Sequence, residues 1–232
     1  MTKEPPQRHR RYSIGASGFE ADSLGPGLYI VATPIGNLGD MTLRGLATLA
    51  AADTVLCEDT RITARLLERY AIGVPLSPYH EHNAAKVRPG ILARLKDGAC
   101  IALVSDAGMP LVSDPGYRLV REAIAEGIPV TACPGPSAVL TGLALSGLPS
   151  DRFAFFGFMP QKSGERKKLL GEIAALKATL VFFDSPHRIC DTLADVAAAL
   201  PGRQVAVARE LTKLHEEVLR GSAQEVAAQL AQ

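Results

Sequence analysis

The sequence has almost no net charge and few cysteines. Its 232 residues contain 25 Lys and Arg against 24 Asp and Glu, a formal net charge of +1. This balance excludes a strongly basic coat for nucleic acid, so any contact with RNA must come from a local patch. The four cysteines form no CxxC motif and no cluster with histidine. They predict buried thiols in a reducing compartment, and neither a zinc site nor a disulfide framework.

Long apolar runs are also missing. The longest one, residues 138–148, has about half of the roughly 20 residues that a membrane-spanning helix needs. No apolar segment with positive flanks opens the chain. We therefore expect a soluble, cytoplasmic protein, long enough for one large or two modest domains.

From Leu28 onward, short apolar runs alternate with longer segments whose apolar residues recur every three or four positions. The first kind predicts strands and the second predicts helices. The candidate strands are Leu28–Thr33, Thr54–Glu58, Ile101–Val104, Val130–Ala132, Phe153–Phe156, Leu180–Asp184 and Val205–Arg209. The candidate helices are Thr42–Ala51, Thr63–Tyr70, Ala84–Lys96, Tyr117–Ala125, Ala138–Leu145, Glu165–Leu176, Ile189–Leu200 and Gln224–Leu230. This alternation predicts an α/β protein whose sheets are covered on both faces.

Proline, glycine and serine mark the expected boundaries. Residues 1–26 combine a basic cluster, Arg8, Arg10 and Arg11, with little apolar content, so we expect a disordered tail that is either solvated or in contact with RNA phosphates. We place an N-terminal domain over 27–132 and a C-terminal domain over 133–232, with the junction inside 133–150. Because a mixed sheet normally receives another strand after its last helix, we expect the second domain to be truncated at its end.

Three loops follow candidate strands, where ligands bind in open α/β sheets. TPIGNLGD (33–40) has two glycines but neither GxGxxG nor a P-loop, so it fits a close approach to a ligand or a plain tight turn. SDAGMPLVSDPG (105–116) is a long loop with two prolines that restrict its backbone, and it carries two carboxylates. These features fit either a binding loop or a structural Ω-loop. CPGPS (133–137) leads into a helix that Ser137 can cap, and its amides also suit a polar ligand group.

Polar clusters follow the other strands. EDTR (58–61) and YHEHN (79–83) predict either helix caps or catalytic groups, and HEH lacks the histidine spacing of a zinc site. QKSGERKK (161–168) holds four cations, which predicts a phosphate-binding patch or a solvated helix start.

Taken in order, these runs resemble the tetrapyrrole-methylase family, the class III methyltransferases that use S-adenosylmethionine. The runs are TPIGNLGD, CEDTR, HEHN, SDAGMPLVSDPG, CPGPSA, GFMPQKSGERKK, SPHR and ARELTKLHEE, and the resemblance covers Leu28 to about Gln232. It implies two α/β domains with the active site in the cleft between them, S-adenosylmethionine as methyl donor, no metal, and usually a homodimer. Within the family, the runs are similar to the branch that methylates a cytidine ribose 2′-hydroxyl in the decoding region of 16S rRNA, which makes the small ribosomal subunit the expected partner.

The candidate site residues fall into three sets. The resemblance carries the donor site onto Pro34, Gly36, Asp106, Gly108, Ser113, Asp114, Pro115, Pro134, Gly135 and Ser137. Position at strand ends makes Asp59, His80, His82 and Glu210 candidate bases and Arg61, Arg188, Arg209 and Lys213 candidate cations, with Asp59 and Arg61 favoured. The RNA-binding set is Lys162, Arg166, Lys167, Lys168, Arg188 and Lys213.

Two other functions stay open at this point. One is methylation of a tetrapyrrole carbon, although a macrocycle does not need the phosphate track that the cationic run of residues 161–168 offers. The other is a donor-binding or ribosome-binding module without catalysis.

Overall fold

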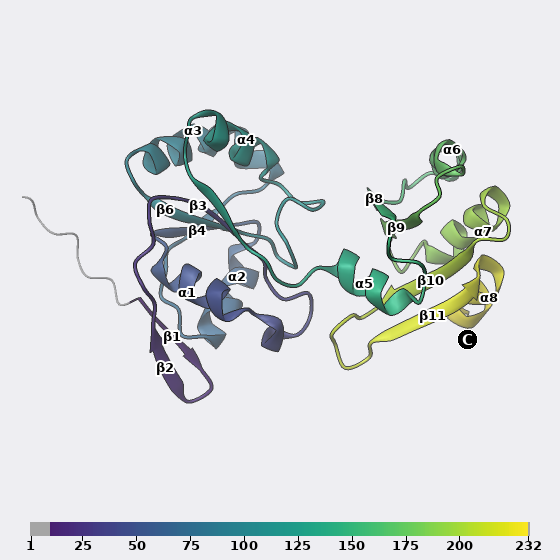
Figure 1. Cartoon of the computed structure of the whole chain (residues 1–232), viewed down its shortest axis with the longest axis horizontal. Coiled ribbons are helices and arrows are strands. Elements are labelled where there is room, and N and C mark those ends of the chain that lie inside the picture. Colours follow the sequence, from purple (N-terminus) through teal and green to yellow (C-terminus); the bar gives the residue numbers. More distant parts are fainter. Residues whose placement is uncertain (1–9, 232) are drawn as a thin grey trace, which may run out of the picture. The chain divides into compact units, whose positions relative to one another are not determined.

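The computed structural model describes residues 10–231, which divide into two units (Figure 1). The first unit ends at Pro136 and the second begins at Ser137. This division lies inside the junction expected at 133–150, and Cys133 is still part of a strand in the sheet of the first unit.

A parallel sheet of five strands forms the centre of the first unit. The strands are β3 (Gly27–Val31), β4 (Thr54–Cys57), β5 (Leu76–Pro78), β6 (Cys100–Val104) and β7 (Val130–Cys133). Their order is β5-β4-β6-β3-β7, and all neighbours run parallel. The sequence predicted all of them except β5, which is too short to show a periodic pattern and ends at a proline.

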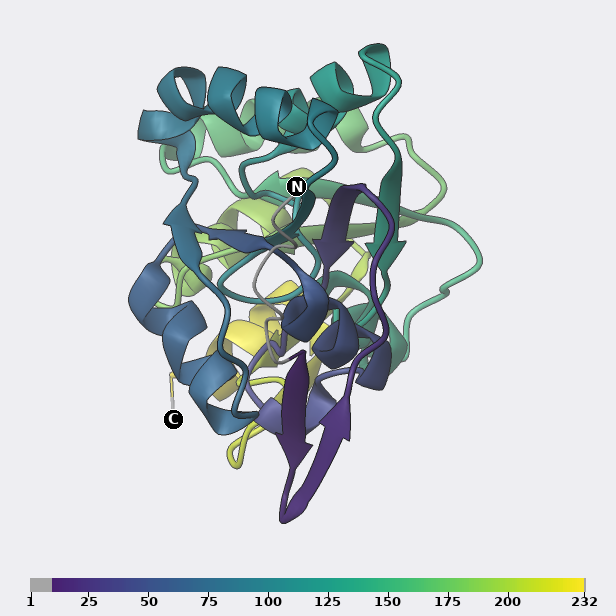
Figure 2. The same ribbon diagram turned by 90° about the vertical axis from the view of Figure 1, so that its left-hand side faces the viewer.

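Helices cover both faces of this sheet, as predicted (Figures 1 and 2). They are α1 (Leu43–Ala51), α2 (Thr60–Arg69), α3 (Glu81–Lys96) and α4 (Tyr117–Ala125), with a short 3-10 helix η1 (Leu38–Asp40) before α1. Because strand side chains alternate, Val31 and Val104 pack with α1 and α2, whereas Ile30 and Leu103 pack with α3 and α4.

An antiparallel hairpin precedes the sheet, formed by β1 (Arg11–Ile14) and β2 (Ser17–Glu20). The prediction of a disordered tail is wrong for this part, and residues 1–9, which include Arg8, lie outside the described residues. The rings of Tyr12 and Phe19 stack with centroids 5.4 Å apart, and the N–H of Ser13 donates to the carbonyl of Tyr70. The hairpin is therefore held by contacts with the folded unit, which local composition does not reveal.

The second unit consists of two strand pairs and four helices. Parallel β8 (Phe153–Phe158) and β9 (Thr179–Phe183) form one pair, and antiparallel β10 (Gln204–Arg209) and β11 (Glu217–Ser222) form the other. The helices are α5 (Ala138–Ser146), α6 (Ser163–Ile173), α7 (Ile189–Ala199) and α8 (Ala223–Leu230). The sequence missed β11, but the predicted α/β class is confirmed for both units.

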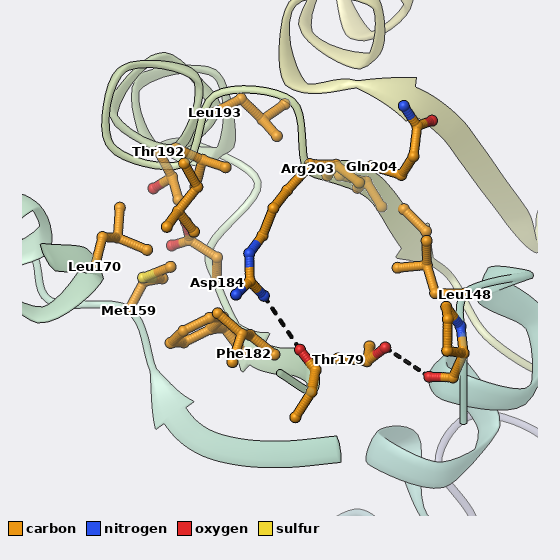
Figure 3. A pocket seen from close by; sticks show the side chains of 18 of the residues that line it. Leu148, Met159, Leu170, Thr179, Phe182, Asp184, Thr192, Leu193, Arg203 and Gln204 are labelled. Carbon is orange, nitrogen blue, oxygen red and sulfur yellow. Dashed lines mark hydrogen bonds between the residues drawn. The ribbon is translucent and has the colours of Figure 1, made fainter. Parts of the chain in front are cut away.

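An apolar cavity of about 460 Å³ lies in the second unit, lined by β9 and β10 together with α7 (Figure 3). Two buried polar atoms in its lining, Asp184 Oδ2 and Thr192 Oγ1, have no hydrogen-bond partner. At one side, the guanidinium of Arg203 donates to the carbonyls of Ala174, Leu176 and Ala178. Arg203 thus closes the loop between α6 and β9.

The cysteines differ in exposure. Cys57 and Cys133 are buried, but Cys100 is half-buried and Cys190 is exposed, so the prediction of four buried thiols is wrong for the last two. Among residues 10–231, no helix combines the length and apolarity that a membrane span requires.

Candidate functional site

The carboxyl ends of the five parallel strands bring the polar loops of the first unit to one edge of the sheet. TPIGNLGD follows β3, EDTR follows β4, YHEHN follows β5, SDAGMPLVSDPG follows β6, and PGP follows Cys133 at the end of β7. β3 and β6 are neighbours, yet α1 after β3 and α4 after β6 cover opposite faces. In open α/β sheets such a divergence places the ligand crevice at this position, so the β3–β6 edge is the candidate ligand crevice.

The loops after β3 and β6 are hydrogen-bonded to each other at this crevice. The N–H of Thr33 donates to the carbonyl of Gly108 over 2.9 Å, and the N–H of Gly108 donates back over 3.1 Å. The buried hydroxyl of Thr33 donates to the carbonyl of Ser105 over 2.9 Å. Predicted donor-site residues on both loops are therefore held in a fixed relation.

The main chain of the loop after β6 is strained. Leu111 and Ser113 have φ of 75° and 65°, a region that side chains other than glycine rarely adopt. Gly108 and Gly116 have φ of 89° and 128°. Strain of this kind concentrates at binding and catalytic sites, which favours the binding-loop interpretation over a structural Ω-loop.

Three carboxylates lie at the carboxyl ends of β4 and β6. Burial raises the pKa of Glu58, and the charges of Asp114 and Asp106 raise it further. Burial also raises the pKa of Asp114, where the charge of Asp106 adds to the effect and a hydrogen bond with Ser105 opposes it. These neighbouring carboxylates make the edge acidic, and a cationic ligand with hydroxyl or ammonium donors would stabilise their charges.

Asp59 behaves differently from these carboxylates. Its Oδ1 accepts from the N–H and Nε of Arg61, and its Oδ2 accepts from Arg61 over 2.6 Å. These bonds lower the pKa of Asp59 to about 2. Asp59 therefore caps α2 and forms an ion pair, which makes it a weak proton acceptor.

The loop after β5 holds a buried tyrosine, Tyr79, which belongs to the predicted YHEHN cluster but is not among the candidate bases named from the sequence. Tyr79 is 1% exposed, and burial raises its pKa, with a hydrogen bond to Arg88 opposing this effect. The neighbouring rings of His80 and His82 lie 6.0 Å apart, and the buried Nδ1 of His80 has no hydrogen-bond partner. Tyr79 and Glu58 both belong to clusters that the sequence placed at strand ends, but their burial, which distinguishes them from their neighbours, was not visible in the sequence.

The remaining predicted donor-site residues also lie at this edge or in the segment that leaves it. Pro34 is buried, whereas Gly36 and Pro134 are exposed. A Cβ on Gly135 would come within 3.0 Å of the Ala32 Cβ, so this glycine packs against β3. Ser137, the first residue of the second unit, accepts from the N–H of Leu140 and caps α5.

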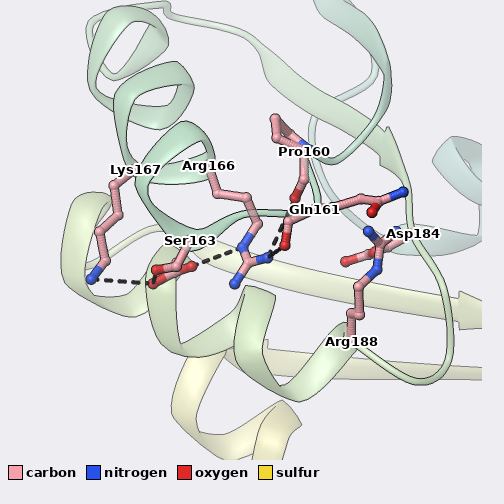
Figure 4. Close-up of polar contacts among 8 residues, drawn as sticks. Pro160, Gln161, Ser163, Arg166, Lys167, Asp184 and Arg188 are labelled. Carbon is pink, nitrogen blue, oxygen red and sulfur yellow. Dashed lines mark hydrogen bonds and ion pairs between the residues drawn. The ribbon is translucent and has the colours of Figure 1, made fainter.

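The cationic run 161–168 is divided in its roles (Figure 4). Lys162, Lys167 and Lys168 are exposed, but Arg166 is 4% exposed. Arg166 donates to Asp195 over 2.8 Å and to the carbonyls of Pro160 and Gln161. The prediction that Arg166 binds RNA is wrong, because its guanidinium is used inside the fold.

The other predicted cations of the second unit are paired with acids. Arg188 contacts Asp184 over 3.2 Å and is about a quarter exposed. Lys213 contacts Glu210 over 2.9 Å, and Glu210 has a positive φ of 51° in the loop between β10 and β11. Arg209 pairs with Glu217. Within residues 10–231, three or more His, Cys, Asp or Glu side chains do not gather into a metal-binding group.

Comparisons with known proteins agree with this architecture. The chain is 53% identical over 210 residues to ribosomal RNA small subunit methyltransferase I of Mesorhizobium japonicum, covering 90% of this chain and 71% of that protein. It is 48% identical to the protein of that name from Thermotoga maritima, over 85% of this chain and 89% of that protein.

Solved structures show the same fold at low identity. The methyltransferase CobJ superposes with a TM-score of 0.67 at 20% identity, over 88% of this chain and 89% of that one. Diphthine synthase superposes with a TM-score of 0.66 at 17% identity, over 87% of this chain and 83% of that one. The family profile "Tetrapyrrole (Corrin/Porphyrin) Methylases" matches residues 27–227. The resemblance predicted from the motifs is thereby confirmed, and the chain belongs to the tetrapyrrole methylase family.

Proposed function

We propose that this protein is an S-adenosylmethionine-dependent methyltransferase of small-subunit 16S rRNA, acting on a cytidine ribose 2′-hydroxyl in the decoding region. The relatives named ribosomal RNA small subunit methyltransferase I, at about half identity over most of the chain, carry the rRNA assignment. The strained, acidic crevice at the β3–β6 edge is the structural observation that supports donor binding there.

The side chains and glycines at the β3–β6 edge fit S-adenosylmethionine. That molecule supplies an electrophilic methyl group on a cationic sulfonium, and its ammonium and ribose hydroxyls are hydrogen-bond donors. Asp106 and Asp114 offer carboxylate acceptors, and ionisation of Asp114 is disfavoured until a cation or donor group compensates for its burial. Gly108 and Gly135 allow the main chain to approach a ligand closely.

The chain's own residues then have to position the methyl donor and the ribose hydroxyl and to accept the proton of that hydroxyl. Transfer forms an oxygen–carbon bond, breaks a sulfur–carbon bond, and releases the proton of the hydroxyl. Holding the reacting atoms about 3–3.5 Å apart supplies roughly 7–11 kcal/mol of the barrier reduction. Glu58 suits acceptance of this proton better than Asp59, because its raised pKa makes it the stronger base and, among residues 10–231, no ion pair engages it.

The test is transfer of labelled methyl from the donor to small ribosomal subunits that lack the modification. Label recovered in a cytidine ribose of 16S rRNA is the expected result. Label only in a porphyrinoid, or donor binding with no transfer to either substrate, contradicts the proposal.

A further inference from the structure

The second unit presents an exposed aromatic ring at the end of β8. Phe158 is the last residue of this strand, and 62% of it is exposed. The ring lies 5.3 Å from that of Phe183, which also packs edge-to-face on Phe155 at 4.9 Å. One side of the Phe158 ring therefore packs on an aromatic cluster formed with Phe183 and Phe155.

A bulge in β8 produces this exposure. The register between β8 and β9 shifts between Phe155 and Phe158, and Gly157 has φ of 71°. Phe156 stacks on Phe182, whereas Phe155 and Phe158 both contact Phe183, the next residue of β9. Because successive strand residues point to opposite faces, the bulge has turned Phe158 away from the Phe156 side. Bulges re-aim side chains in this way at functional sites.

The loop that leaves Phe158 carries positive charge. Lys162 is 82% exposed on its side chain, and Lys167 and Lys168 follow on α6. The segment 162–168 has four cations, while Glu165 and Asp195 supply the carboxylates that pair with it, so two positive charges remain. The next strand end, after Phe183, holds Arg188, whose charge is paired with Asp184.

We propose that Phe158 is a stacking platform for one unpaired base of the substrate RNA, with Lys162 and Lys168 on the adjoining phosphates. This inference rests on the proposed function. Proteins that bind single-stranded RNA combine an aromatic face for the base with lysines or arginines along the backbone. The core of a protein–protein interface is instead depleted of lysine, so RNA suits this surface better than a second copy of the chain.

The absence of tryptophan makes a direct test possible. Phe158→Trp introduces the chain's single indole, and stacking with a base should quench its fluorescence when a single-stranded oligoribonucleotide of the decoding-region sequence is added. Phe153→Trp, at the other end of β8 and 42% exposed, is the matched control and should show no quenching. Equal quenching in both variants overturns the platform.

Affinity supplies the second measurement. Phe158→Ala should bind the oligoribonucleotide about 5- to 150-fold more weakly, and Phe158→Tyr about as well as wild type, because stacking is worth roughly 1–3 kcal/mol per base. Donor binding by calorimetry should be the same in all three proteins. Unchanged RNA affinity in Phe158→Ala overturns the inference. If this variant, with RNA affinity unchanged, also has half the wild-type mass in light scattering, Phe158 instead belongs to a contact between copies of the chain. A wild type that neither binds nor methylates small-subunit RNA would instead overturn the proposed function.

Discussion

The main-chain N–H of Asp59 donates a hydrogen bond over 3.2 Å to Oδ1 of Asp106. This bond joins the loop after β4 to the loop after β6, two strands that are neighbours in the sheet. The bond uses one oxygen of Asp106, so we expect the second oxygen to be available to a ligand at this edge.

Asp106→Ala should weaken binding of S-adenosylmethionine about 10- to 100-fold, because a hydrogen bond to a charged group is worth roughly 1.5–3 kcal/mol. Circular dichroism should show an intact fold, since Asp106 is only half-buried. Asp97→Ala, at the exposed C-cap of α3, is the control and should bind like wild type in calorimetry. If Asp106→Ala and Asp114→Ala both keep full affinity, the loop is not part of the donor site.

Asp114→Asn should lower donor affinity and raise the melting temperature of the ligand-free protein. Burial raises the pKa of Asp114 above its ordinary 3.8, so the ionised carboxylate destabilises the folded state at neutral pH. As the pH falls from 7 towards 4, the folded protein takes up this proton before the unfolded chain does. Wild type should therefore regain stability relative to the variant over that range. Thermal melts at several pH values measure this, and a pH-independent difference would contradict it.

Glu58→Gln should reduce kcat about 10²- to 10⁴-fold with little change in donor affinity, the usual effect of removing a catalytic base. In wild type, activity should fall on the acid side at a pH above the ordinary 4.5 of glutamate, since burial raises this pKa. Asp59→Asn is the comparison, and it should lower kcat much less. Single-turnover methylation of small subunits separates the two, and a larger effect in Asp59→Asn would return the role to Asp59.

Gly116→Ala should destabilise the protein by about 1–3 kcal/mol, since φ is 128° and the new Cβ would lie 2.8 Å from a methyl of buried Leu103. Gly171→Ala, in α6 with nothing within 4 Å, should stabilise it by about 0.5–1 kcal/mol. Urea unfolding gives both values, and a Gly116→Ala protein as stable as wild type would show that the loop after β6 relaxes freely.

Neutralising Lys162, Lys167 and Lys168 to Gln should flatten the dependence of RNA affinity on salt, by about 0.7 in slope for each lost contact with a single strand. Lys86→Gln, at an exposed position of α3 in the first unit, should leave the slope unchanged. Arg166 is excluded from the set because breaking its buried pair with Asp195 costs about 3–5 kcal/mol of stability. A slope equal to that of wild type would mean that the three lysines are merely solvated.

Periodicity and loop chemistry predicted most of the first unit. Apolar runs such as Ile101–Val104 fall inside strands, and parallel strands place their carboxyl ends together, so loops 33–40 and 105–116 meet at one edge. The helix caps at Asp59 and Ser137 were also visible as spacing. These features depend on residues close in sequence.

The errors come from contacts between distant residues. Arg166 reads as one of four similar cations, and only Asp195, a helix away, identifies it as buried. The hairpin 11–20 depends on Tyr70, and the difference between Glu58 and Asp59 depends on which carboxylates lie nearby. Composition carries no information about such partners.

The two strand pairs of the second unit have a consequence for handling this chain. In the part that the structure describes, β9 pairs only with β8 and β10 only with β11, so each has one edge whose row of amides and carbonyls is not paired with another strand. Rows like these are templates on which foreign extended segments add. Self-association through them should grow with concentration and set the range in which the protein stays monodisperse.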